Sequence, residues 1–99
     1  MLLKINIVVL THNNQGYHQE FMHLQKMAAR RQRGIDGSSW VGNELRNPDI
    51  NLAKIVEGMG VWAEGPITDP SEVGPAMARA LSVVDAGEPA FVDVRCQPR

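Results

Sequence analysis

One short polar segment carries most of the side chains that could do chemistry. Residues 12–20 read His-Asn-Asn-Gln-Gly-Tyr-His-Gln-Glu. An asparagine side-chain oxygen and a free backbone carbonyl are hard, neutral ligands that suit Mg²⁺ or Ca²⁺, and phosphate oxygens commonly complete the coordination of Mg²⁺. A diphosphate bridged through a divalent ion would therefore fit this segment. The alternative is a turn without any ligand, because asparagine, glutamine and glycine in this order also form turns for backbone reasons alone.

The elements on either side of this segment must position it. Residues Ile5 to Leu10 form an almost continuous aliphatic run, which is typical of a parallel strand that is buried on both faces. Apolar residues recur at helical spacing after the turn and predict a helix over Tyr17–Arg31, with its apolar side formed by Phe21, Leu24, Met27 and Ala28. A strand, a polar turn and a helix together form the unit that builds ligand sites in α/β proteins.

The middle of the chain predicts a loop followed by a short helix. Glycine and serine residues over Gly34–Arg46 indicate a loop, and Trp40 and Val41 in its middle indicate that part of this loop docks on something. Asn47-Pro48-Asp49 predicts a helix cap with a first-turn proline, for a helix that ends before Gly60. A brief strand is expected over residues 61–63.

The last third of the chain predicts one more helix and one more strand. Asp69-Pro70-Ser71-Glu72 indicates a helix start, although Pro75 requires that the helix either kinks there or begins near Gly74. Gly87 should end this helix, and residues 90–96 should form the closing strand. The order of elements predicts an α/β fold of three layers, with a mostly parallel sheet and helices on both faces.

Bulk properties exclude several kinds of partner. A net charge of -1 creates no general field for nucleic acid or for an anionic membrane. The basic run Arg30, Arg31 and Arg33 has no interleaved aromatic residues, so we expect a solvated helix end there and no nucleic-acid binding. No apolar stretch would span a bilayer and no export leader is visible, so we expect no membrane association. The single cysteine, Cys96, favours a reducing, cytoplasmic compartment.

Several of these segments together resemble a known family. The buried strand followed by Asn13-Asn14-Gln15-Gly16-Tyr17, the segments 47–54 and 58–61, and the segment 87–94 resemble the second half of the diphosphate-binding domain of thiamine-diphosphate-dependent enzymes. The similarity is to the acetolactate synthase and pyruvate decarboxylase type, and it covers nearly the whole chain. It implies that the cofactors are thiamine diphosphate and Mg²⁺, and that residues 1–99 form half of such a domain.

The resemblance also implies roles for individual residues. Asn14 would give its side-chain oxygen to Mg²⁺ and Gly16 its backbone carbonyl. Asn13 and Tyr17 would belong to the cofactor-binding segment, with Asn13 supporting the turn. Glycine suits position 16 because the carbonyl must approach a metal in an unusual backbone geometry.

Two further residues are weaker catalytic candidates. Glu20 falls where some relatives place a glutamate near the substrate end of the cofactor. Its alternative role is an exposed first-turn acid that the helix dipole stabilises. His18 could face the cofactor cleft and assist proton transfer, or it could be solvated.

Parts of the family's machinery are expected to be absent from this chain. The Gly-Asp-Gly half of the metal site does not precede the first strand, and no pyrimidine-binding domain is present, so the chain would be a fragment or a short homologue that is inactive alone. We expect it to associate as a homodimer, or with a chain that supplies the missing half-domain and the pyrimidine-binding domain, because removal of neighbouring strands exposes an apolar sheet edge.

The family's reaction begins with a 2-keto acid and releases carbon dioxide, in decarboxylases, carboligases and acetolactate-synthase-like enzymes. The alternative is a noncatalytic association or regulatory module.

Overall fold

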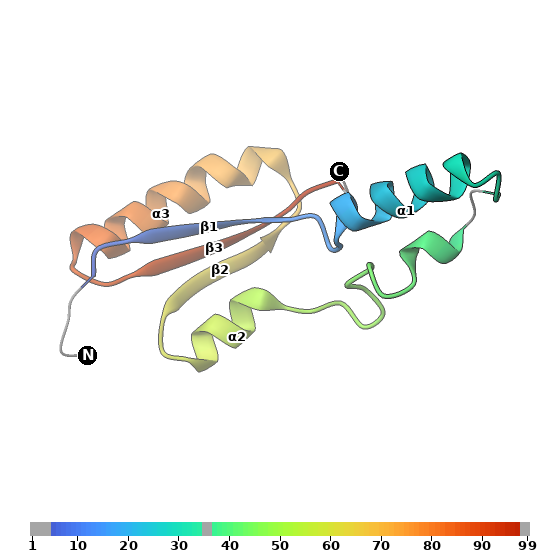
Figure 1. Ribbon diagram of the computed structural model, residues 1–99. Coiled ribbons are helices and arrows are strands. Elements are labelled where there is room, and N and C mark those ends of the chain that lie inside the picture. Colours follow the sequence, from blue (N-terminus) through green and yellow to red (C-terminus); the bar gives the residue numbers. More distant parts are fainter. Residues whose placement is uncertain (1–4, 35–36, 98–99) are drawn as a thin grey trace. The chain divides into compact units, whose positions relative to one another are not determined.

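The computed structural model describes residues 5–34 and 37–97 (Figure 1). The chain divides into two compact units. The sheet unit comprises Met1–Asn13 and Asn51–Cys96, and the helical unit comprises Asn14–Ile50 with Gln97–Arg99. Within the described ranges, no helix is both long enough and apolar enough to cross a membrane.

The sheet unit is built on three parallel strands. These are β1 (Val8–Asn13), β2 (Trp62–Ile67) and β3 (Ala90–Arg95), in the order β1-β3-β2, so that the last strand lies between the other two. Helix α3 (Val73–Asp85) lies along one face of the sheet, and helix α2 (Leu52–Gly58) lies on the opposite side (Figure 1). The α/β class, the parallel sheet and the helices on both faces are confirmed.

The core of the sheet unit consists of small side chains at the contact between α3 and β3. Ala76 and Ala80 are fully buried and lie one helical turn apart on the same face of α3. They pack against Ala90 and Val92 of β3, together with Ile67 of β2. Alanine at these helix positions lets the backbone of α3 approach the sheet closely, so larger side chains there would force the layers apart.

The first strand differs from its prediction in both position and burial. The predicted range was Ile5–Leu10, whereas β1 spans Val8–Asn13 and therefore carries the strand into the polar segment. Val9 is 44% exposed and Leu10 is 51% exposed, so the prediction of burial on both faces was wrong. The reason is the strand order, which places β1 at an edge of the described sheet.

The start of α2 also differs from its prediction. Asn47 has φ of +60° and lies in a turn over residues 46–49, so it does not cap the helix. The cap is Asn51, whose side chain accepts a hydrogen bond of 3.0 Å from the Lys54 amide. Both asparagines suit a helix cap by type, and Asn51 is the one that lies next to the apolar run.

The second strand is longer than predicted. It extends to Ile67 through Gly65 and Pro66, with a shift in register between Glu64 and Ile67. Gly65 lies against β3, and a Cβ atom there would fall 2.6 Å from the Asp93 carbonyl oxygen. Gly65 therefore lies where the two strands approach each other too closely for a side chain.

The start of α3 resolves the question raised by Pro75. Asp69 caps a short 3₁₀ segment, Pro70–Glu72, and the α-helix proper begins at Val73. The prediction that the helix begins near Gly74 is confirmed. Pro75 then lies in the first turn, where its missing amide costs no helical hydrogen bond.

The helical unit contains α1 (His18–Arg30) and a short 3₁₀ segment, η1 (Gly37–Trp40). The predicted helix over Tyr17–Arg31 therefore agrees with α1 to within one residue at each end. The prediction that part of the loop docks is confirmed by Trp40, which packs against Phe21 of α1, whereas Val41 is 80% exposed.

Candidate functional site

The candidate site is the turn that immediately precedes α1. The Gly16 amide donates a hydrogen bond of 3.3 Å to the Asn14 side-chain oxygen, which closes the turn on itself. Gln15 has φ of +57°, in the left-handed region that tight turns use. The turn residues predicted from the sequence, Asn14, Gly16 and Tyr17, are thus held in one local structure.

A segment from the following loop holds this turn in place. The Tyr17 amide donates to the Asn43 carbonyl (2.7 Å), and the Leu45 amide donates to the Gln15 carbonyl (2.8 Å). These two bonds make an antiparallel bridge between Gly16 and Glu44. Residues 43–45 are therefore part of the site, although the sequence showed only an irregular loop there.

Position 16 has no room for a side chain. A Cβ atom there would lie 2.9 Å from the Asn43 carbonyl oxygen and 3.2 Å from the Trp40 ring. The first of these contacts is with backbone, which cannot move without breaking the bridge. Glycine is thus required by the close approach of another segment, in addition to any requirement that a ligand imposes.

The Gly16 carbonyl is available as a ligand. No residue of the described ranges donates a hydrogen bond to it, whereas the carbonyls of both neighbours, Gln15 and Tyr17, accept backbone amides. A backbone carbonyl without a donor is satisfied by water, a cation or a ligand. This is the feature expected of a carbonyl that coordinates a metal.

An aromatic cluster supports the turn from the side of α1. The rings of Phe21 and Trp40 are stacked, with centroids 3.9 Å apart and planes inclined by 19°. His18 lies against both rings at 5.8 and 6.4 Å. Because Trp40 also touches position 16, this cluster connects the packing of η1 to the shape of the turn.

His18 and Glu20 do not converge on one point. The His18 Nδ1 atom is buried and has no hydrogen-bond partner within the described part of the chain. Glu20 is exposed and lies with His23 around a separate hollow of about 510 Å³. Two residues separated by two positions on a helix point about 200° apart, which explains the separation.

Asn13 belongs to the sheet unit and is anchored there. Its side-chain amide donates to the Asp93 carboxylate at 3.4 Å, and its carbonyl accepts the Cys96 amide at 2.8 Å. Asp93 is fully buried in β3, and its other carboxylate oxygen has no partner within the ranges described. Sequence reasoning missed Asp93, although an acid between Val92 and Val94 in an apolar strand is a signal of a buried polar group.

The chemistry of the turn fits a partial magnesium site. No group of three or more His, Cys, Asp or Glu among the described residues could hold a metal ion. The turn offers neutral oxygens from Asn14 and Gly16, and an amide oxygen has two lone pairs, so it can close a turn and still bind a cation. Mg²⁺ accepts a small number of protein ligands when phosphate oxygens complete its shell.

Comparison with known proteins gives one match. The family model for "Thiamine pyrophosphate enzyme, C-terminal TPP binding domain" matches residues 1–94, which is most of the chain. No curated protein and no solved structure matches.

Proposed function

Because the chain belongs to the family of C-terminal TPP-binding domains of thiamine pyrophosphate enzymes, we propose that its Asn14–Gly16 turn holds the magnesium-bound diphosphate in an enzyme acting on 2-keto acids. The observation that carries the proposal is Gly16. Its carbonyl has no hydrogen-bond donor in the described residues, and its position admits no side chain.

Individual residues of the chain would have separate roles in holding the cofactor. Asn14 and Gly16 bind the cation through oxygen atoms, and Tyr17 follows them with its amide committed to Asn43. Asn13, the last residue of β1, donates to Asp93 of β3 within the sheet unit. Thiamine diphosphate, when bound, supplies the carbon nucleophile that attacks the keto carbon and permits loss of carbon dioxide.

His18 is the better of the two catalytic candidates. Its buried Nδ1 atom and its place in the first turn of α1 suit a group that holds or passes a proton near the turn. Glu20 is exposed, and we assign it the role of a first-turn acid that the helix dipole stabilises. The alternative function is a noncatalytic association module, in which the turn remains but binds no cofactor.

Calorimetric titration of the purified chain with thiamine diphosphate and Mg²⁺ tests the proposal. We expect binding in the micromolar range, which Asn14→Ala should weaken by about tenfold or more, the equivalent of about 1.4 kcal/mol. Asn14→Asp keeps an oxygen ligand and should retain binding. Omission of Mg²⁺ should abolish it, because the turn offers no cationic side chain to the diphosphate.

A second readout and a matched glycine control sharpen the test. In the variant Trp62→Phe, Trp40 is the single tryptophan. Its ring lies next to Gly16, so its fluorescence should change when the turn binds the cofactor. Gly16→Ala should abolish the signal, whereas Gly74→Ala, which meets nothing within 4 Å, should not. Absence of heat with the unsubstituted chain at millimolar cofactor would favour the noncatalytic module.

A further inference from the structure

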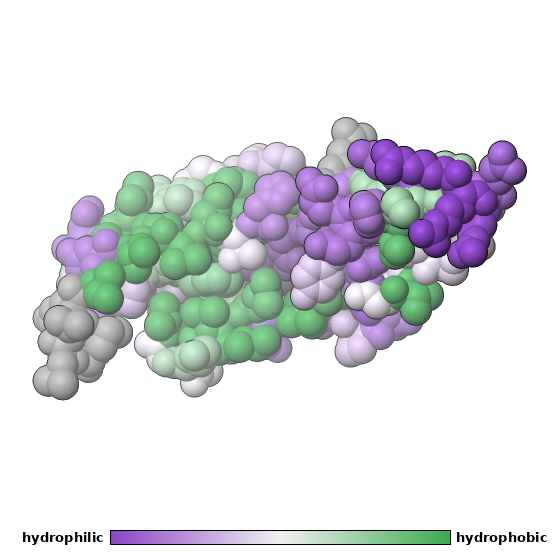
Figure 2. Space-filling view, viewed as in Figure 1, coloured by the Kyte–Doolittle hydropathy of each residue, from purple (hydrophilic) through white to green (hydrophobic). Residues whose placement is uncertain are grey.

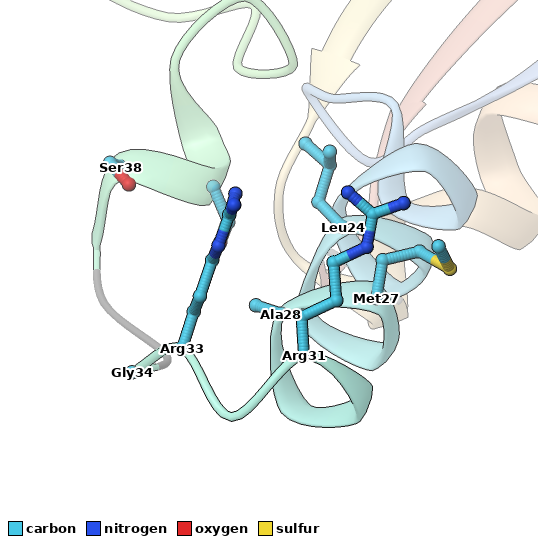
Figure 3. Close-up of a pocket in the computed structure, with 8 residues that line it drawn as sticks. Leu24, Met27, Ala28, Arg31, Arg33, Gly34 and Ser38 are labelled. Carbon is cyan, nitrogen blue, oxygen red and sulfur yellow. The ribbon is translucent and has the colours of Figure 1, made fainter.

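A second polar cavity lies in the helical unit, apart from the turn. It has a volume of about 590 Å³ and is lined by the last turns of α1, the residues that follow, and the start of η1 (Figure 3). Two arginines, Arg31 and Arg33, line it together with Ser39. Apolar side chains of Leu24, Met27 and Ala28 also line it.

Neither arginine has a carboxylate within salt-bridge distance among the residues that the structure describes, a range that leaves out Asp36. Both side chains extend in the same direction as Leu24 (Figure 3). Two like charges that line one cavity repel each other, so an anion between them would relieve this repulsion.

The local sequence strengthens this excess of charge. Residues 21–43 contain Lys26, Arg30, Arg31 and Arg33 against one acid, Asp36, although the whole chain has a net charge of -1. Figure 2 shows the hydrophilic side chains gathered over the far end of α1. Favourable interaction of cations with a helix C-terminus explains one or two of these residues, since the dipole acts within the last turn. It does not explain why Arg33, beyond the helix, lines the same cavity as Arg31.

The donors in the cavity match a phosphate group. Each guanidinium offers a planar fork that binds two oxygens, and a serine hydroxyl adds a further donor. A phosphate monoester has three terminal oxygens and up to two negative charges, so it matches two cationic forks in charge and in number of acceptors better than a singly charged carboxylate does. We propose that this cavity binds a small phosphorylated organic molecule, with its phosphate between Arg31 and Arg33 and its apolar part on Leu24 and Met27.

The proposal is independent of the cofactor site. It requires neither Mg²⁺ nor the Asn14–Gly16 turn, and none of the residues that line the cavity is aromatic, which distinguishes it from a surface for stacking nucleic-acid bases. The earlier expectation of a solvated helix end at Arg30–Arg33 is the competing explanation.

Titration of the full chain with phenyl phosphate, inorganic phosphate and benzoate tests the proposal by calorimetry without Mg²⁺. We expect phenyl phosphate to bind more tightly than either probe. The double variant Arg31→Gln, Arg33→Gln should bind phenyl phosphate about tenfold or more weakly. Added salt should also weaken the binding of phenyl phosphate. Leu24→Ala should weaken phenyl phosphate but leave inorganic phosphate unchanged. NMR shifts of the arginine side chains should report direct contact.

Matched variants separate this site from the other charges and from the cofactor turn. Arg79→Gln removes an arginine that is already paired with Glu64 and should leave binding unchanged. Asn14→Ala should also leave it unchanged. The proposal is overturned if phenyl phosphate fails to bind at millimolar concentration, if the double arginine variant binds equally well, or if benzoate binds more tightly.

Discussion

At the scale of single residues, the contact between Asn13 and Asp93 joins positions 80 apart in the sequence. A fully buried carboxylate is costly unless hydrogen bonds satisfy it, and here one oxygen has the Asn13 amide while the other has no partner in the described residues. Asn13 therefore matters to the sheet as well as to the turn. A change at Asn13 should therefore affect stability, which has to be measured separately from cofactor binding.

We predict that Asn13→Ala lowers the free energy of unfolding of the sheet unit by about 1–3 kcal/mol, because it leaves a buried carboxylate without this donor. Asp93→Ala combined with Asn13→Ala should cost less than the sum of the two single changes. Urea unfolding followed through Trp62, in a Trp40→Phe background, measures this. Strictly additive costs would show that the pair does not interact.

At the scale of secondary structure, the start of α3 depends on one carboxylate. The Ser71 backbone amide donates to Asp69 at 2.9 Å and the Ser71 hydroxyl at 2.8 Å. These bonds, the backbone one first, lower the pKa of Asp69 below its usual value. The charged form is therefore favoured in the folded state, and the cap becomes weaker when the carboxylate is protonated.

This gives a pH dependence with a definite sign. The stabilisation from Asp69 is fully present above its unfolded-state pKa, about 3.9. It is lost as the pH falls through the lower folded-state value. Asp69→Asn keeps an acceptor but cannot titrate, so we expect a flatter dependence of the urea midpoint on pH between neutral and acidic conditions. Equal slopes in the two proteins would refute the role of Asp69.

At the scale of the whole molecule, the exposed edge strand is the main unpartnered feature. Val9 and Leu10 of β1 are each about half exposed, and apolar side chains also gather over α2, where Met59 is 78% exposed (Figure 2). An apolar strand at a sheet edge invites pairing with another chain. We propose that two copies of the chain associate through β1.

Leu10→Lys should disrupt this association and raise the dimer dissociation constant by about tenfold or more, since lysine protects strand edges. Leu81→Lys is a matched control, because Leu81 is 53% exposed on α3 and Leu10 is 51% exposed on β1. Sedimentation equilibrium over a range of concentrations measures the effect. A monomer at every concentration, or equal disruption by both variants, would contradict the proposal.

The sequence by itself determined the local features of this protein. The bounds of α1, the start of α3 after Asp69, and the polar turn over residues 14–17 follow from spacing, capping and turn chemistry, which act between near neighbours. The family also follows from the order of such segments. For α1 and the start of α3, the interactions that decide the structure lie within a few residues of each other.

The tertiary structure alone decided which distant segments meet. It placed β3 between β1 and β2, and it showed that Asn43 and Trp40 leave no space for a side chain at Gly16. It also showed that Asp93 contacts Asn13 and lies against Gly65. These contacts depend on side-chain volume and backbone approach across long separations, which residue type and local spacing do not encode.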